Sequence, residues 1–271
     1  MRQIICIRWG EKYGPTYVNR LFGMVSRHLP GPFRFVCFTA DDRGLREGVE
    51  PAPLPPLDCE TPTGTHGIWG KSRLWNARLL DRDGADIAGP VLYLDLDVVI
   101  RDDLQPFLDH GEPGDVILAR NPNTPFEKLG QTSIYRMPVG ALAPIRETFL
   151  KDPQGIATRY RFEQRFVSRH APGGVRFWPR SWVAVYKWHC VPTFPLNYLL
   201  APKEPKARVV LFPGPLNPPD AVAGRWRAEL STSGVLDHLR ALTDGRRVET
   251  RREHLRHFVR PAPWVAEHWR E

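Results

Sequence analysis

The sequence predicts an α/β fold with a central, mostly parallel sheet. Two short apolar runs, Gln3–Arg8 and Arg34–Thr39, have the composition of buried strands. Between them, apolar residues recur at helical spacing after Pro15, and proline is tolerated in the first turn of a helix. A strand, a helix and a strand in this order form a β-α-β unit, whose two strands lie parallel with the helix on one face.

Composition narrows the class of protein. The chain has 271 residues, of which 42% are hydrophobic and 25% charged, so it is neither a disordered chain nor a coiled coil. The net charge of +8 favours anionic partners, but no module of basic and aromatic residues indicates nucleic-acid binding. The four cysteines form no CxxC motif, and no apolar run reaches the roughly 18 residues of a membrane span. We therefore expect a reduced, cytoplasmic protein.

The remaining elements follow in order along the chain. Residues 41–67 are rich in proline and glycine and predict a long loop without regular structure. A helix is expected at Trp69–Leu80 and a strand at Val91–Leu94, after which Val98–Ile100 continue the apolar run. Further strands are expected at Val116–Ala119, Thr132–Tyr135, Val175–Trp178, Trp182–Trp188 and Val209–Phe212. Further helices are expected at Ile145–Leu150, Arg159–His170, Val235–Leu242 and Arg252–Phe258, before an aromatic end, Trp264–Trp269.

An acidic pair in the third strand is the strongest signal of function. Asp95 and Asp97 stand inside the run Tyr93-Leu94-Asp95-Leu96-Asp97-Val98, where burial of carboxylates is costly unless something compensates them. Strand alternation places both on one side, and ligands of parallel sheets bind at the carboxyl ends of strands. Mg²⁺ and Mn²⁺ take carboxylate and phosphate oxygens, so the pair predicts a cation that bridges the protein and a diphosphate. The alternative interpretation is a strand end with two exposed acids.

Two enzyme families place such a pair after an apolar strand. The segment Asp95-x-Asp97-x-Val99 resembles the first motif of the haloacid-dehalogenase phosphatases. That resemblance implies a nucleophilic Asp95 and a general acid, Asp97. The motif usually closes the first strand of the catalytic domain, whereas here a whole β-α-β unit precedes it. No downstream acidic pair with a partnering lysine follows.

Five stretches in order support the second family. They are Arg8-Trp9-Gly10-x-x-Tyr13-Gly14, Phe38-Thr39-x-Asp41-Asp42, Trp69-Gly70-Lys71, Leu94-Asp95-Leu96-Asp97 and Val259-Arg260-Pro261-Ala262-Pro263-Trp264. Together they resemble the nucleotide-sugar glycosyltransferases of the A-type fold with a DxD motif. This group includes glycogenin and the lipopolysaccharide galactosyl- and glucosyltransferases.

The resemblance implies a fold and an activity. The fold is a central mixed, mostly parallel sheet with a Rossmann-like nucleotide-binding half. The activity is transfer of a hexosyl group from a nucleoside-diphosphate sugar, with UDP favoured, to a glycan or lipid-linked acceptor of cell-surface polysaccharide biosynthesis. Mn²⁺ or Mg²⁺ would assist. We expect one domain, 1–271, with a nucleotide-binding half (1–120), an acceptor and sugar half (121–230) and a helical tail (231–271).

The resemblance also implies roles for individual residues. The nucleotide would contact Arg8, Trp9, Gly10, Tyr13, Asp41, Asp42, Lys71, Asp95 and Leu96. The donor sugar would contact Gln131, Thr132 and Ser133. Catalytic residues would be Asp97, Glu163 and Gln164, and the metal ligands Asp95 and Asp97. Structural alternatives are core packing for Trp9, a helix-entry contact for Tyr13, and solvated helix side chains for Lys71 and the pair Glu163-Gln164.

One departure from the family pattern concerns the metal. Relatives supply a late histidine as a third ligand, but here the matching stretch is Leu211-Phe212-Pro213-Gly214-Pro215, and proline offers no side-chain ligand atom. Three explanations are open. The two aspartates hold the ion together with diphosphate and water; another residue, such as His189, substitutes; or the chain is a catalytically silent sugar-nucleotide-binding relative. His189 is more readily interpreted as a core histidine.

The positive charge and the aromatic tail suggest where the acceptor lies. An anionic, lipid-linked acceptor at the inner membrane face would suit a basic surface. Trp264 and Trp269, with Arg260, could make a peripheral membrane contact. The alternative is that these tryptophans pack on the body of the protein.

Overall fold

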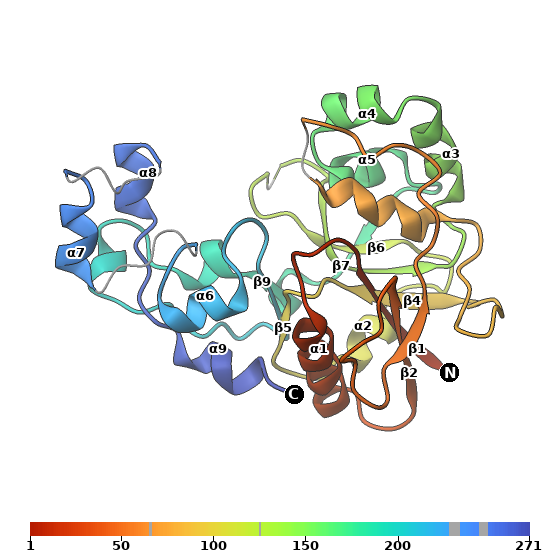
Figure 1. Cartoon of the computed structure of the whole chain (residues 1–271), viewed down its shortest axis with the longest axis horizontal. Helices are drawn as coiled ribbons and strands as arrows, with labels where there is room; N and C mark the ends of the chain where they lie inside the picture. Colours follow the sequence, from red (N-terminus) through yellow and green to blue (C-terminus); the bar gives the residue numbers. More distant parts are fainter. Residues whose placement is uncertain (65–66, 125, 228–233, 244–248) are drawn as a thin grey trace. The chain divides into compact units, whose positions relative to one another are not determined.

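The computed structural model describes residues 1–271 except 65–66, 125, 228–233 and 244–248 (Figure 1). The chain forms two compact units, one of Met1–Leu96 with Asp103–Arg180 and one of Asp97–Asp102 with Ser181–Glu271. The expected boundaries of the functional parts, at residues 120 and 230, stay a prediction. The boundaries of the two compact units lie at other positions.

A seven-stranded sheet forms the centre of the first unit, in the order β3-β2-β1-β4-β7-β6-β8. The strands β1 to β4 pair in parallel, β7 runs antiparallel to both β4 and β6, and β8 is parallel to β6. The mixed, mostly parallel sheet is therefore confirmed. The bounds are β1 Arg2–Arg8, β2 Phe33–Thr39, β3 Glu50–Pro53, β4 Pro90–Leu94, β6 Ile117–Arg120, β7 Gly130–Pro138 and β8 Arg176–Phe177.

Helices cover both faces of this sheet because both faces are apolar. Helix α1 (Pro15–His28) joins β1 to β2, so the expected β-α-β unit is present. Alternation along β1 sends Ile5 and Ile7 into a core shared with Trp69, Phe149 and other aromatic residues. Figure 1 shows α3, α4 and α5 on one side of the sheet and α1 and α2 on the other. The remaining bounds are η1 Gly67–Trp75, α2 Gln105–Asp109, α3 Ala143–Lys151, α4 Pro153–Tyr160 and α5 Glu163–His170.

Two expectations for the first half of the chain are wrong in part. The proline-rich stretch 41–67 contains a strand, β3, which pairs with β2 in the register Cys37 to Pro51 and Thr39 to Pro53. Because β3 is an edge strand, its prolines need not donate to a second neighbour. The helix expected at Trp69–Leu80 is a shorter 3₁₀ helix, η1, that ends at Trp75.

The helix expected at Arg159–His170 is broken in the structure. Helix α4 ends at Tyr160, and Arg161 has a φ of 61°, a conformation that cannot continue a right-handed helix. Helix α5 then begins at Glu163. The break places Glu163 in the first turn of a helix.

The second unit contains a small sheet in the order β5-β10-β9. The strand expected at Trp182–Trp188 is shorter, because β9 ends at Val185 and a π-helical turn, η3, follows. None of the described helices is long and apolar enough to cross a bilayer. The bounds are β5 Val99–Ile100, β9 Val183–Val185, β10 Val209–Leu211, η2 Arg180–Trp182, η3 Tyr186–Cys190, η4 Leu196–Tyr198, α6 Pro218–Ala223, α7 Val235–Arg240, α8 Arg251–Arg256 and α9 Pro263–His268.

The terminal tryptophans are buried within the second unit. Trp264 is 8% exposed and Trp269 is 5% exposed. The indole N–H of Trp264 donates to the carbonyl of Pro202 at 3.1 Å. Packing on the body of the protein is thus the interpretation that the structure supports for both residues.

A stacked pair of histidines joins α7 to α8. The rings of His238 and His254 lie 3.9 Å apart at 8°, and each Nε2 is 2.8 Å from the backbone carbonyl of the other residue. Both residues are buried, and no described residue forms a hydrogen bond with Nδ1 of His254. Protonation would put a charge and an unsatisfied N–H into this stack, and burial accordingly lowers the pKa of His238 below its ordinary value of 6.5.

We predict that α7 and α8 loosen as the pH falls below about 6.5, the ordinary pKa of histidine. The unfolded state then binds a proton that the folded state resists, so the free energy of opening decreases with decreasing pH. Hydrogen exchange of the amides of residues 235–240 and 251–256 between pH 7.5 and 5.5 measures this, after correction for intrinsic exchange. In His238→Phe the dependence should flatten. An equally steep dependence in that variant would contradict the assignment.

Candidate active site

The candidate site lies at the edge of the first unit's sheet where the parallel strands end. Strand β4 ends at Leu94, and Leu94 pairs with Ile134 of the antiparallel β7. The beginning of β7 therefore lies beside the end of β4. The amide of Asp95 donates to the carbonyl of Ser133 at 2.8 Å and extends this pairing by one bond. Antiparallel pairing thus brings the expected sugar-binding segment, 131–133, to the expected nucleotide-binding Asp95.

Lys71 occupies the centre of a buried polar cluster at this edge. Its Nζ lies 2.7 Å from Oδ2 of Asp95 and 3.8 Å from Oε1 of Glu163, and it donates to the carbonyl of Thr132 at 3.2 Å. The side chain of Lys71 is only 7% exposed. The interpretation of Lys71 as a solvated helix side chain is therefore wrong.

Glu163 is the most deeply buried carboxylate of the cluster, at 2% exposure. Its oxygens accept hydrogen bonds from the hydroxyl of Thr132 and the amide of Gln164. Burial raises the pKa of Glu163 above its ordinary value, and the ammonium of Lys71 offsets part of this effect. The interpretation of Glu163 and Gln164 as a solvated helix pair is therefore wrong for Glu163. Gln164 is half-buried.

Two tyrosines, which no motif of the sequence indicated, complete the cluster. The hydroxyl of Tyr93 donates to Oδ1 of Asp95, and its ring lies 4.8 Å from that of Tyr135. Burial first, and then the charge of Asp95, raise the pKa of Tyr93, so this hydroxyl keeps its proton. The buried hydroxyl of Tyr135 has no hydrogen-bond partner among the described residues. Burial raises its pKa, and the carboxylates of Glu163 and Asp95 raise it further. The sequence held one signal for Tyr93, because residues two positions apart in a strand lie on the same side and Tyr93 precedes Asp95 by two positions.

Aromatic packing holds Lys71 in place. Trp69, two residues earlier on η1, stacks on Phe149 of α3 at 5.1 Å, and Trp75 lies 6.1 Å from Phe166 of α5. Gly70 permits a close approach to Trp9, because a Cβ at this position would lie 2.7 Å from Nε1 of that indole. Trp9 is half-buried against the core, as the packing interpretation expected.

A second group of expected nucleotide-binding residues lies at the ends of β1 and β2. Arg8 pairs with Asp41 at 3.3 Å. A hydrogen bond from the Arg43 side chain, more than the charge of Arg8, lowers the pKa of Asp41 to about 2. Nη1 of Arg8 is buried and finds no hydrogen-bond partner in the described part of the chain. The structure thus joins Arg8 and Asp41, two residues 33 positions apart in the sequence, into one charged group.

The other expected contacts are placed individually. Gly10 has a φ of 64°, which favours glycine at this turn. Tyr13 is half-buried, with its ring 4.7 Å from that of Tyr17 at the start of α1, as a helix-entry contact would be. Asp42 is exposed and Leu96 is buried. Gln131 is buried, and its side-chain carbonyl accepts from the amide of Thr132 at 3.0 Å.

The acidic pair does not lie in one continuous strand as expected. Strand β4 ends at Leu94, residues 95–98 form a turn, and β5 belongs to the small sheet of the second unit. Strand alternation therefore does not align Asp95 with Asp97. The two Cα atoms nevertheless stay within about 7 Å, because only Leu96 separates them along the chain. Asp97 is buried at 8% exposure, so the interpretation of two exposed acids is wrong.

The residues present fit a cation only if substrate completes its coordination. No group of three His, Cys, Asp or Glu side chains in the described ranges could hold a metal ion. Both oxygens of Asp95 already bind Lys71 and Tyr93. Pro213 is half-buried, and His189 is exposed, so the expectation of a core histidine is wrong. The donor set matches magnesium-type sites, in which one or two carboxylates bind the ion together with substrate phosphates.

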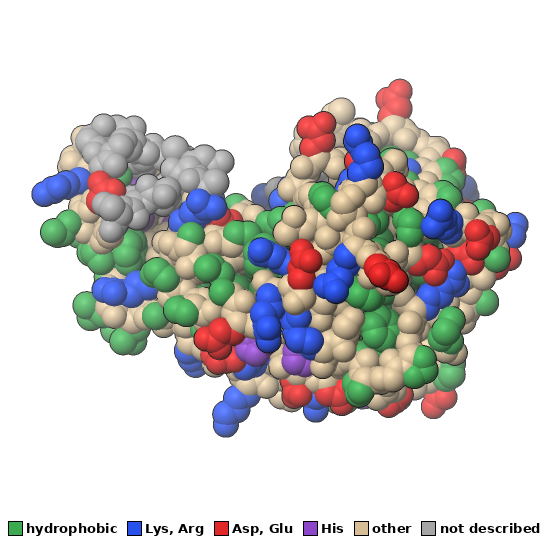
Figure 2. Space-filling model, turned by 60° about the horizontal axis from the view of Figure 1, so that its bottom comes forward, with side chains coloured by type: hydrophobic (Ala, Val, Ile, Leu, Met, Phe, Trp, Pro, Cys, Tyr) green, Lys and Arg blue, Asp and Glu red, His purple; other side chains and the backbone are tan. Residues whose placement is uncertain are grey.

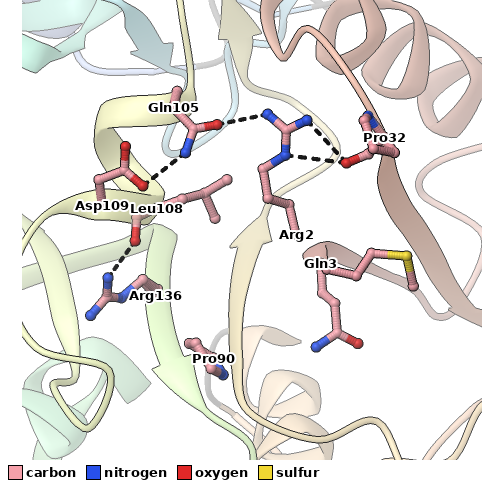
Figure 3. Close-up of a pocket in the computed structure, with 9 residues that line it drawn as sticks. Arg2, Gln3, Pro32, Pro90, Gln105, Leu108, Asp109 and Arg136 are labelled. Atoms are coloured by element: carbon pink, nitrogen blue, oxygen red, sulfur yellow. Dashed lines mark hydrogen bonds between the residues drawn. The ribbon is translucent and has the colours of Figure 1, made fainter.

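A cavity of about 620 Å³ lies at the opposite edge of the sheet, among the amino ends of β1 and β4 (Figure 3). Arg2 donates to Gln105 at 2.7 Å and to the carbonyl of Pro32, and Arg136 donates to the carbonyl of Leu108 at 2.6 Å. These side chains tie neighbouring segments together. Because ligands of parallel sheets bind at the carboxyl ends of strands, we place the candidate site at the edge with Lys71.

Comparisons with known proteins support the fold. A scan against protein-family models and a search of curated proteins give no match. The galactosyltransferase LgtC, solved with donor and acceptor sugar analogues, is 15% identical, with a TM-score of 0.56 over 93% of this chain and 98% of that chain. GlyE from Streptococcus pneumoniae is 11% identical, with a TM-score of 0.54 over 94% of this chain and 63% of that chain.

The bifunctional glycosyltransferase WbbM is a third similar structure. It is 13% identical, with a TM-score of 0.51 over 80% of this chain and 46% of that chain. The chain therefore has the fold of these bacterial glycosyltransferases, and the A-type fold expected from the sequence is confirmed.

We predict that Lys71→Met destabilises the first unit by about 3–5 kcal/mol at pH 8, because it leaves two carboxylates without their buried cation. The loss should be smaller at pH 5. Without Lys71 the pKa of Glu163 rises further, and a raised pKa gives stability that is lost as the pH increases. Urea unfolding at both pH values measures the difference, with Lys71→Arg as the charge-conserving control. Equal losses at pH 5 and pH 8 would refute the electrostatic account.

Proposed function

We propose that this protein is a glycosyltransferase that moves a hexosyl group from a nucleoside-diphosphate sugar to a glycan or lipid-linked acceptor. The observation that carries the proposal is the buried Lys71–Asp95–Glu163 cluster at the carboxyl edge of an A-type sheet. The similarity to LgtC also supports the proposal, because it extends over nearly all of both chains. LgtC was solved with donor and acceptor sugar analogues.

The charge balance of the cluster suits a substrate with a cationic reacting centre. One ammonium faces two carboxylates, so the cluster carries excess negative charge when both are ionised. Glycosyl transfer passes through an oxocarbenium-like transition state, which a fixed carboxylate stabilises. We assign this role to Glu163, aligned by Thr132 and Lys71, and sugar contacts to Gln131, Ser133 and Gln164.

The leaving diphosphate requires positive charge. Lys71 can supply it if the diphosphate competes with Asp95 for its ammonium. A divalent cation, Mn²⁺ or Mg²⁺, bound through Asp97 and Asp95, would offset the rest of the charge on the leaving group. Arg8, Trp9, Gly10, Tyr13, Asp41, Asp42 and Leu96 stay our proposed nucleotide contacts, with UDP the favoured nucleotide.

One competing function has a specific observation behind it. The described residues offer no three-ligand metal group, and Pro213 stands where a ligand was expected, which favours a catalytically silent sugar-nucleotide-binding protein. Such a protein would bind a donor without turnover. The phosphatase alternative gains no support, because both oxygens of Asp95, its required nucleophile, are hydrogen-bonded and the fold matches glycosyltransferases.

We predict that UDP with Mn²⁺ raises the melting temperature of the wild-type protein by roughly 5–10 °C at saturating ligand. Asp97→Asn should abolish the manganese-dependent part while its own melting temperature stays close to wild type. Asp102→Asn, in the same segment but 61% exposed at its side chain, is the matched control and should keep the full shift. A full shift in Asp97→Asn would remove Asp97 from the metal site.

A second prediction concerns Glu163. Glu163→Gln should lower the rate of sugar transfer or donor hydrolysis by about 100-fold or more, since a fixed negative charge next to the reacting carbon is lost. The wild-type rate should fall at acidic pH with an apparent pKa above the ordinary 4.5 of glutamate, because protonation cancels the same charge. The variant should lack this acidic limb, and the control Glu127→Gln should retain it. An unchanged pH profile in Glu163→Gln would exclude this role.

A further inference from the structure

Exposed hydrophobic side chains are concentrated in the second unit. Among the described residues, ten large hydrophobic side chains are exposed, and seven of them lie within residues 188–200 and 235–240. Single exposed leucines are ordinary, but a cluster of this kind marks a binding surface. Figure 2 shows hydrophobic side chains, with Lys and Arg side chains among them, on the side of the second unit that carries α7.

Five of these exposed side chains are leucines that lie on or directly after two short helices, η4 and α7. Leu196, Leu199 and Leu200, in and directly after η4, follow the i, i+3, i+4 spacing of one helix face and are 48%, 71% and 53% exposed. On α7, Leu236 and Leu239 have the i, i+3 spacing and are 71% and 37% exposed. The five leucines are called the leucine patch below.

The buried sides of the two helices pack together, so the leucines belong to one body. Tyr198 lies 6.1 Å from the ring of His238 and stacks at 5.0 Å on Phe258. The side chain of Asn197 donates to the carbonyl of Phe258 at 2.9 Å. Polar and aromatic residues thus face inward while leucines face outward, the reverse of the usual pattern for a small helical body in water.

Unpaired arginines accompany the leucine patch. Arg240 on α7 and Arg251, Arg252 and Arg256 on α8 are exposed, and they form no ion pair within the described part of the chain. Nearby acids are engaged elsewhere: Glu253 caps α8, and Glu249 pairs with Arg227 and His257. Residues 181–271 hold 14 Lys and Arg against 9 Asp and Glu, or five of the chain's eight net positive charges.

We propose that the leucine patch and these arginines dock the protein on an anionic lipid bilayer. Leucines enter the boundary between headgroups and acyl chains, and the arginines pair with lipid phosphates. The charge selects a bilayer over a second copy of this chain, because two copies in contact would bring like charges together. The buried Trp264 and Trp269 take no part. The inference does not depend on the proposed glycosyl transfer.

Vesicle sedimentation tests the docking surface with the full-length protein. The wild type should partition onto vesicles of phosphatidylcholine mixed with phosphatidylglycerol at least about tenfold more strongly than onto phosphatidylcholine alone, and raised salt should remove the difference. The double variant Leu199→Glu/Leu236→Glu should lose about tenfold or more of the binding, since each leucine is lost from the apolar phase. Arg240→Glu/Arg252→Glu should weaken binding to the anionic vesicles alone.

Controls separate docking from a general loss of structure. Leu80→Glu replaces an exposed leucine of the first unit, at 38%, and should bind vesicles as the wild type does. If the double variant does not fold, anionic vesicles should still slow hydrogen exchange of residues 235–240 in the wild type. Wild-type binding that is absent, equal on both vesicle types or unchanged in the leucine variant would overturn the proposal. A leucine-dependent dimer without vesicle binding would overturn it in favour of a second copy.

Discussion

A single buried ammonium group organises the carboxyl edge of the sheet. Lys71 must balance Asp95 and Glu163, which reach it from different elements, and none of the three is tolerable there alone. Three features of the fold bring these charged groups together. The aromatic packing of η1 fixes Lys71, the break at Arg161 starts a helix at Glu163, and antiparallel β7 brings Thr132 beside β4. The result is a polar centre within an otherwise apolar core.

Much of this arrangement could be predicted from the sequence, because its signals are local. Apolar runs gave β1, β2 and β4, and a helical period gave α1. The acidic pair stood out as chemically unusual, and the resemblance to the glycosyltransferases indicated Lys71. What the sequence could not show was tertiary: that β7 reverses direction, so that Thr132 meets Glu163, and that Tyr93 supplies a hydrogen bond to Asp95.

The errors have physical causes that can be named. Residues 95–98 look like a continuous strand by hydrophobicity, but the chain turns there between two sheets. The prolines of β3 argued against a strand at this position. They are tolerated because β3 lies at the edge of the sheet. In the second unit, the sequence left open whether Trp264 and Trp269 contact a membrane or pack on the protein, because burial depends on neighbours that the sequence does not reveal. Leucines, ordinarily core residues, are the ones left exposed.

We propose that a sugar nucleotide binds where β1, β2 and β4 end. Photo-crosslinking with 5-azido-UDP-glucose, followed by peptide mapping, tests this location directly. We expect labelling of peptides that contain residues 8–13 or 41–42, with protection by excess UDP. Labelling confined to the opposite edge, around Arg2 and Arg136, or labelling that UDP does not compete away, would contradict it.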